Sequence, residues 1–129
     1  MKYKKFEELP VWQHSLEITK EVYDLTSRQA FKKDLGLVNQ IRRAIVSVSS
    51  NIVEGFEKNN NNEFVRFLRI AKGSIGEARN QFYIALSVGY LDRVGFDTMN
   101  NKMEKLAGEI GGLMVYLEKF KKQSAMRNS

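Results

Sequence analysis

The sequence QIRRAIVSVSSNIVEG spans residues 40–55 and has the periodicity of a helix with two distinct faces. Its apolar residues recur every three or four positions and continue one turn upstream: Leu37, Ile41, Ala44, Ile45, Val48 and Ile52. A polar stripe with the same spacing lies directly beside them: Gln40, Arg43, Ser47, Asn51 and Glu54. Only two of these polar residues have the long charged side chains that coat solvent-facing helices. The pattern predicts a helix that packs one face into a core and sets the adjoining edge against protein.

The rest of the chain has the composition of a helical protein with a single core. The 129 residues fit one domain, residues 1–129, and include one proline and nine glycines. Valine, isoleucine and threonine never alternate with polar residues over the length of a strand. The fold class predicted is therefore all-α.

Four helices are expected, with boundaries set by local signals. Pro10 suits a first helical turn, Asp34 is a good N-cap, and Gly89 has the position of a residue that ends a helix. The asparagines at 59–62 indicate a tight turn, and Asn60 with Glu63 has the spacing of a capping box. The predicted helices cover residues 10–26, 34–56, 61–88 and 97–120, and the basic tail 121–129 is expected to be disordered. Short connections favour an antiparallel up-down-up-down four-helix bundle.

Two packing expectations follow from side-chain size. On the first helix the large apolar residues predict the core contacts: Trp12, Leu16, Val22 and Tyr23. On the last helix Gly108, Gly111 and Gly112 each lower helix propensity by roughly 1 kcal/mol. We expect these glycines to let another helix approach closely.

Several function classes lack the residues they need. Without cysteine the chain can form neither a disulfide nor a thiolate metal site, which fits a reducing compartment. The N-terminus MKYKKFEELP has no apolar run behind its charges, and the longest apolar run near the C-terminus, residues 113–117, is too short to cross a bilayer. We expect a cytoplasmic protein without a membrane segment.

No constellation for catalysis or metal binding stands out. His14 is the single histidine, and together with Glu17 it offers only two ligands on one helix. The mid-helix serines have no second histidine to serve as a base. Glu54 and Glu77 could be paired carboxylates for acid–base chemistry, but hydrogen bonds or ion pairs account for them more simply. We expect no enzyme activity, no cofactor and no bound metal.

The helix predicted for residues 61–88 repeats the two-face pattern. Beside its apolar face lies a polar edge, which consists of Glu63, Arg66, Ser74, Glu77 and Gln81. Two such edges can interlock within one bundle to fix helix register, or across subunits to form a self-association surface. Both alternatives stay open, and the residues expected to take part are Gln40, Ser47, Asn51, Glu54, Ser74 and Glu77.

A net charge of +6 favours polyanionic partners through counterion release, although solvated surface charge explains it equally well. The candidate nucleic-acid-binding residues lie on the second and third predicted helices: Arg42, Arg43, Arg66, Arg69, Lys72 and Arg79. In an oligomer each basic patch would recur around the axis and gain affinity by avidity. No recognition helix or aromatic-rich strand is evident, so we expect binding of RNA or DNA with weak sequence specificity.

The same motifs resemble those of a known family. Residues 40–44 (QIRRA), 47–48 (SV) and 51–55 (NIVEG) are similar to the signature of the four-helix bundle proteins encoded in intervening sequences of bacterial 23S ribosomal RNA genes. The likeness continues through residues 63–64, 67–68, 70–71, 73–74, 77 and 89–91, and begins with Phe6, Leu9, Val11 and Trp12. It covers about residues 6–120. Lys32 departs from it where a proline is common after Phe31, and Ile45 is bulkier than the usual small residue.

The resemblance implies an antiparallel bundle that assembles as a homopentamer with a basic surface. It also implies kinship with the accessory variability proteins of diversity-generating retroelements, which bind nucleic acid and a reverse transcriptase. Two functions are therefore expected as alternatives. One is a non-enzymatic oligomer that binds structured RNA, and the other is an assembly module that recruits a protein partner such as a reverse transcriptase.

Overall fold

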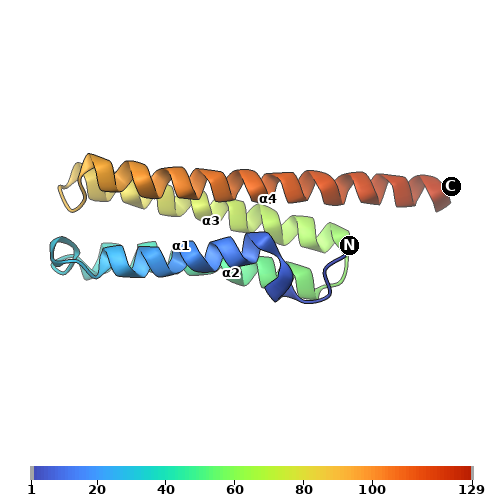
Figure 1. The fold of residues 1–129 in the computed structure, drawn as a ribbon, viewed down its shortest axis with the longest axis horizontal. Coiled ribbons are helices and arrows are strands. Elements are labelled where there is room, and N and C mark those ends of the chain that lie inside the picture. Colours follow the sequence, from blue (N-terminus) through green and yellow to red (C-terminus); the bar gives the residue numbers. More distant parts are fainter. Residues whose placement is uncertain (1, 129) are drawn as a thin grey trace.

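The structure is a computed structural model that describes the backbone of residues 2–128 and the side chains of residues 2–120. Four helices make up nearly all of it: α1 (Pro10–Thr26), α2 (Leu35–Glu57), α3 (Asn61–Ser87) and α4 (Arg93–Asn128). Two 3-10 turns, η1 (Phe6–Glu8) and η2 (Gln29–Phe31), precede α1 and α2, and the described residues contain no strand. The all-α class is confirmed. The helices lie side by side as long rods, and successive turns join them at alternating ends (Figure 1).

Side-chain caps start the second and third helices. The Asp34 carboxylate accepts a hydrogen bond from the Leu37 backbone N–H at 3.0 Å, and the Asn60 amide oxygen accepts one from Glu63 N–H at 3.0 Å. Asp34 also accepts from the Tyr90 hydroxyl at 3.1 Å, which ties the start of α2 to the α3–α4 turn. That hydrogen bond raises the pKa of Tyr90, because ionising the phenol would break it. In the same turn Gly89 has a positive φ of 83°, which glycine adopts without strain.

α4 is longer than the sequence predicts at both ends. It begins at Arg93 rather than Asp97, because the Asp92 carboxylate accepts a hydrogen bond from Gly95 N–H at 2.7 Å and so caps the helix earlier. Its backbone is helical to Asn128, where the sequence predicts a disordered tail from residue 121. No proline or glycine follows Gly112, so nothing in the covalent backbone stops the helix.

The core lies along the four helices, and of the contacts predicted for α1 it includes Val22 and the partly buried Trp12 but not Leu16 and Tyr23. Leu16 and Tyr23 are 50% and 40% exposed. Two small polar residues, Ser15 and Thr26, are among the buried residues of α1. The full set is Val11, Ser15, Ile18, Val22, Leu25 and Thr26. Ser15 is fully buried because its hydroxyl donates to the Trp12 carbonyl at 2.7 Å. A prediction based on large apolar side chains overlooks such a position.

At Gly55, α2 packs closely against α3. A Cβ built on Gly55 would lie 2.7 Å from Phe67 Cβ and 3.0 Å from Phe64 Cδ1, so only glycine fits there. The expectation of close approach at the α4 glycines is wrong. Gly108 and Gly112 are exposed with no atom within 4 Å of an added Cβ, and Gly111 would meet only the end of the Lys72 side chain. Gly108 and Gly112 thus lie on the outer side of α4.

No helix in the described part of the chain combines the length and apolar character required to span a membrane.

Candidate nucleic-acid interface

The polar stripe of α2 meets the polar edge of α3 within one chain. The Ser47 and Ser74 hydroxyl oxygens are 3.0 Å apart. The Asn51 amide donates to the Ser47 carbonyl at 2.8 Å and to the Ser47 hydroxyl at 3.0 Å. Ser74 is only 7% exposed, so its hydroxyl has little access to water. The contact with Ser47 gives it a hydrogen-bond partner within the protein. Three of the six predicted contact residues are therefore brought together, and they couple the register of α2 to that of α3.

The other three predicted contact residues, Gln40, Glu54 and Glu77, are exposed on the same side of the bundle. Among the described residues the structure gives none of them a hydrogen bond or an ion pair. Two isoleucines of α3, Ile70 and Ile84, are each 43% exposed and follow the spacing of Ser74 along one helix face. We call this surface the α2–α3 face: Gln40, Ser47, Asn51, Glu54, Ile70, Ser74, Glu77 and Ile84. It combines short polar groups with exposed apolar side chains.

Most basic candidates on α3 are neutralised by carboxylates. Arg66 Nε lies 2.7 Å from Glu63 Oε2, and this contact lowers the pKa of Glu63. Arg69 lies 4.0 Å from Glu118, with both side chains exposed. Lys72 is exposed and has no ion pair among the described residues. The α3 set is thus weaker as a phosphate-binding surface than its sequence suggests.

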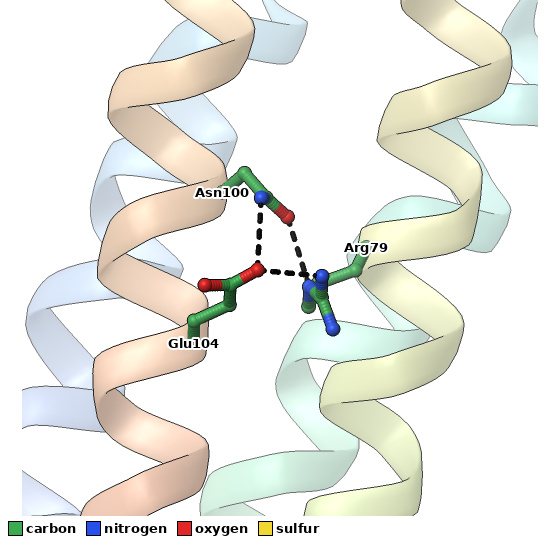
Figure 2. Close-up of polar contacts among 3 residues, drawn as sticks. All are labelled: Arg79, Asn100 and Glu104. Atoms are coloured by element: carbon green, nitrogen blue, oxygen red, sulfur yellow. Dashed lines mark hydrogen bonds and ion pairs between the residues drawn. The ribbon is translucent and has the colours of Figure 1, made fainter.

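Arg79 has a structural position between α3 and α4 (Figure 2). Its Nε donates to the Asn100 amide oxygen at 2.8 Å, and its Nη2 donates to Glu104 Oε1 at 2.7 Å. The Asn100 amide nitrogen donates to the same Glu104 oxygen at 3.2 Å. Asn100 is only 8% exposed, so Arg79 supplies the hydrogen bond that its buried oxygen needs. These three hydrogen bonds link α3 to α4. Because the Arg79 guanidinium is engaged in two of them, it is a weak candidate for binding phosphate.

Arg79→Met is expected to lower the free energy of unfolding by about 1–3 kcal/mol, because the Asn100 oxygen loses its donor in a buried site. Arg69→Met is the matched control, since it removes the same charge from an exposed pair that contributes little. Urea unfolding followed by circular dichroism measures both variants. Equal stability of the two variants would contradict the role given to Arg79.

Arg42 is held differently from the α3 arginines, because its partners are neutral. Its guanidinium lies 4.5 Å above the Tyr23 ring, and its Nε donates to the Thr26 hydroxyl at 3.0 Å. Its Nη2 donates to the Ser27 hydroxyl at 3.1 Å. These contacts fix the orientation of the guanidinium without cancelling its charge. A cation held in place in this way loses little further entropy when it binds an anion.

Arg42 and Arg43 both line an open depression between α1 and α2 with a volume of about 610 Å³. We call it the α1–α2 depression, and it is formed by Tyr23, Asn39, Arg42, Arg43, Val46, Ser47 and Ser50. The lining includes two arginines, three hydroxyl groups and an amide, and it includes no carboxylate. Apart from Ser47, whose hydroxyl contacts Ser74 and Asn51, each of its polar side chains can donate a hydrogen bond to a phosphate.

The sequence pattern identifies Arg42, Arg43 and Ser47 from this lining but not Tyr23, Asn39 and Ser50. Tyr23 comes from another helix, so no local spacing connects it to Arg42. Asn39 and Ser50 lie on the same face of α2 as Arg43, so helical periodicity could have identified them from the sequence.

His14 belongs to a different seam, where α1 meets α4. Its Nδ1 lies 2.6 Å from Glu109 Oε2, and Lys102 pairs with Glu21 at 2.8 Å further along the same two helices. Glu17 lines the same shallow groove of about 260 Å³. Within the described residues, no group of three or more histidine, aspartate or glutamate side chains is arranged to hold a metal ion. The histidine thus bridges two helices through Glu109.

Comparisons with known proteins agree on the fold and on the family. The family model described as 23S rRNA-intervening sequence protein matches residues 7–112. A crystal structure at 1.70 Å of a protein with unknown function, from the S23 ribosomal protein family of Bacteroides thetaiotaomicron VPI-5482, has a TM-score of 0.74 to this chain at 20% sequence identity. The match covers 81% of this chain and 97% of that one. No curated protein matches the sequence.

Proposed function

The chain belongs to the 23S rRNA-intervening sequence protein family, and we propose that it is a non-enzymatic, oligomeric protein that binds structured RNA in the bacterial cytoplasm. The observation that carries this proposal is the α1–α2 depression. It presents two adjacent arginines, one of them fixed by neutral partners, without a carboxylate in its lining. The net charge of the whole chain, +6, supports a polyanionic ligand.

The proposed assembly multiplies this surface. We take the protomer to be an antiparallel up-down-up-down bundle, and the resemblance of the sequence to its family supports a homopentamer. The α2–α3 face is the proposed subunit contact, because its exposed isoleucines Ile70 and Ile84 lie beside short polar side chains that a neighbouring helix can approach closely. Five copies of one weak phosphate site would bind a folded RNA with high avidity.

The proposal is tested by measuring the affinity of the protein for a stem–loop RNA over a range of salt concentrations. The affinity is expected to fall steeply as salt rises. Arg43→Gln is expected to weaken binding about tenfold at low salt and to reduce the slope of log affinity against log salt by about one for each phosphate that Arg43 neutralises. Arg43 is exposed, so the variant leaves the core intact.

Lys105→Gln is the control, because it removes the same charge from the α1–α4 groove. A similar loss in both variants would show that net charge, rather than the α1–α2 depression, determines binding. Light scattering coupled to size exclusion measures the mass of the same samples, and a monomer would contradict the proposed assembly.

A stable oligomer with no affinity for RNA would favour the alternative function, an assembly module that recruits a protein partner such as a reverse transcriptase. In that case the basic surface would face an acidic surface of the partner. A gene beside a reverse transcriptase would support the kinship with accessory variability proteins, whereas a gene inside a ribosomal RNA operon would support the RNA-binding proposal.

A further inference from the structure

At one end of the bundle the N-terminal segment lies beside the α2–α3 turn (Figure 1). A further hollow lies between these two segments. Its volume is about 310 Å³, and we call it the asparagine pocket: Tyr3, Lys4, Phe56, Asn59, Asn60, Asn61 and Phe64. Three amides, three aromatic rings and one lysine thus surround one small space, with no carboxylate among them. The amides come from the run of asparagines that the sequence marks only as a turn.

We propose that the asparagine pocket binds an unpaired nucleobase, of the kind exposed in an RNA loop or bulge. This inference rests on the proposed function, since it takes RNA as the ligand, and it adds a preference for unpaired bases. Proteins that read single-stranded RNA stack its bases on aromatic side chains and bond the base edges with polar groups. The pocket holds both kinds of group.

The amides have hydrogen-bonding capacity left for a ligand. The Asn60 oxygen caps α3 by accepting from Glu63 N–H, so its amide nitrogen remains as a donor. In the described part of the chain the Asn59 and Asn61 side chains make no hydrogen bond. A carboxamide offers a donor and an acceptor side by side, and this pair matches the N6 and N7 edge of adenine. Among the bases, adenine is therefore the expected preference.

The aromatic side chains form the apolar wall of the pocket. Phe56 and Phe64 pack edge to face with their centroids 5.9 Å apart, and Phe64 is only 3% exposed. Tyr3 and Phe56 are half-buried and so retain surface that a base can cover. Because Phe64 is buried, its ring is held in place, and Phe56 packs against it. Stacking of a base on such a ring is sequence-tolerant, because every base has a flat apolar face.

Cations lie around the pocket, where they can contact the phosphates on either side of a bound base. Lys4 lines it directly, and Lys2 lies 5.4 Å from the Tyr3 ring centroid. The pocket also shares α2 with the α1–α2 depression. From Arg43 to Phe56, both on α2, the helix rise gives a separation of roughly 20 Å, so one folded RNA can contact both.

The test compares two stem–loop RNAs with the same stem, one with an adenine loop and one with an abasic loop. The wild-type protein is expected to bind the adenine loop about tenfold more tightly. Tyr3→Leu, which keeps apolar packing but removes the ring, and Asn61→Ala are expected to abolish this difference while leaving affinity for the abasic loop unchanged. Tyr3→Phe keeps the ring and is the matched control. Circular dichroism checks that each variant folds.

Nuclear magnetic resonance with adenosine alone gives a second readout that does not depend on phosphate contacts. Adenosine is expected to shift the side-chain amide signals of Asn59 and Asn61 and to leave Asn39, in the α1–α2 depression, unchanged. Equal affinity for both loops, together with unshifted amides, would overturn the asparagine pocket but leave the proposed function intact. Failure of both RNAs to bind would overturn both proposals.

Discussion

Gly55→Ala is expected to destabilise the protein by about 1–3 kcal/mol, even though alanine is the better helix former. The added methyl would lie 2.7 Å from Phe67 Cβ and 3.3 Å from the Phe64 carbonyl oxygen. Neither atom is at the end of a flexible side chain, so relief requires α2 and α3 to move apart. That movement would loosen the neighbouring Ser47–Ser74 contact as well. Urea unfolding monitored by circular dichroism gives the change in free energy.

The control for this substitution is Gly108→Ala on α4. No atom lies within 4 Å of an added Cβ there, so the variant is expected to gain about 0.5–1 kcal/mol from higher helix propensity. The two substitutions are chemically identical and are expected to have opposite signs. If Gly55→Ala also stabilised the protein, the close approach of α2 to α3 would be wrong.

Ile45→Ala is expected to cost about 2–5 kcal/mol, which is a large part of the roughly 5–15 kcal/mol that typically separates folded from unfolded protein. Ile45 is fully buried in the core, and truncation would leave a cavity between α2 and its neighbours. The resemblance marks this residue as bulkier than the small residue usual at its position. In this chain the isoleucine fills core volume that the surrounding side chains leave for it.

Val46→Ala tests the same helix one residue further on. Val46 is 38% exposed, so losing its methyl groups is expected to change the free energy of unfolding by less than about 1 kcal/mol. Thermal unfolding of both variants in the same buffer provides the comparison. Similar losses at positions 45 and 46 would mean that the buried face of α2 is assigned incorrectly.

The helices themselves follow from signals that are local in sequence. Periodic apolar residues, the Asp34 and Asn60 caps and the turn at Gly89 each act within a few residues, so the chain reveals them without a structure. The start of α4 is an exception, because the predicted helix begins at residue 97 and the observed one at Arg93. Only the structure shows the hydrogen bond from Gly95 N–H to Asp92 that caps the helix earlier.

The candidate interface depends on contacts between helices, which local patterns do not show. Glu63 and Arg66 are three residues apart, and their pairing was readable from spacing alone. The partners of Arg42 and Arg79 are 15 to 25 residues away, so their structural roles needed the fold. The same holds for the pocket that joins Tyr3 to the asparagines of the α2–α3 turn.

The polar contacts between α1 and α4 have a consequence for how the bundle opens. The Glu21–Lys102 ion pair and the His14–Glu109 hydrogen bond join the two helices that are farthest apart along the chain, and all four side chains are partly exposed. Added salt screens such pairs, while the apolar contacts of α2 with α3 are not weakened by it. We therefore expect added salt to weaken the contact of α1 with α4 more than that of α2 with α3, and amide protons of α1 to exchange with solvent before those in the centre of α3.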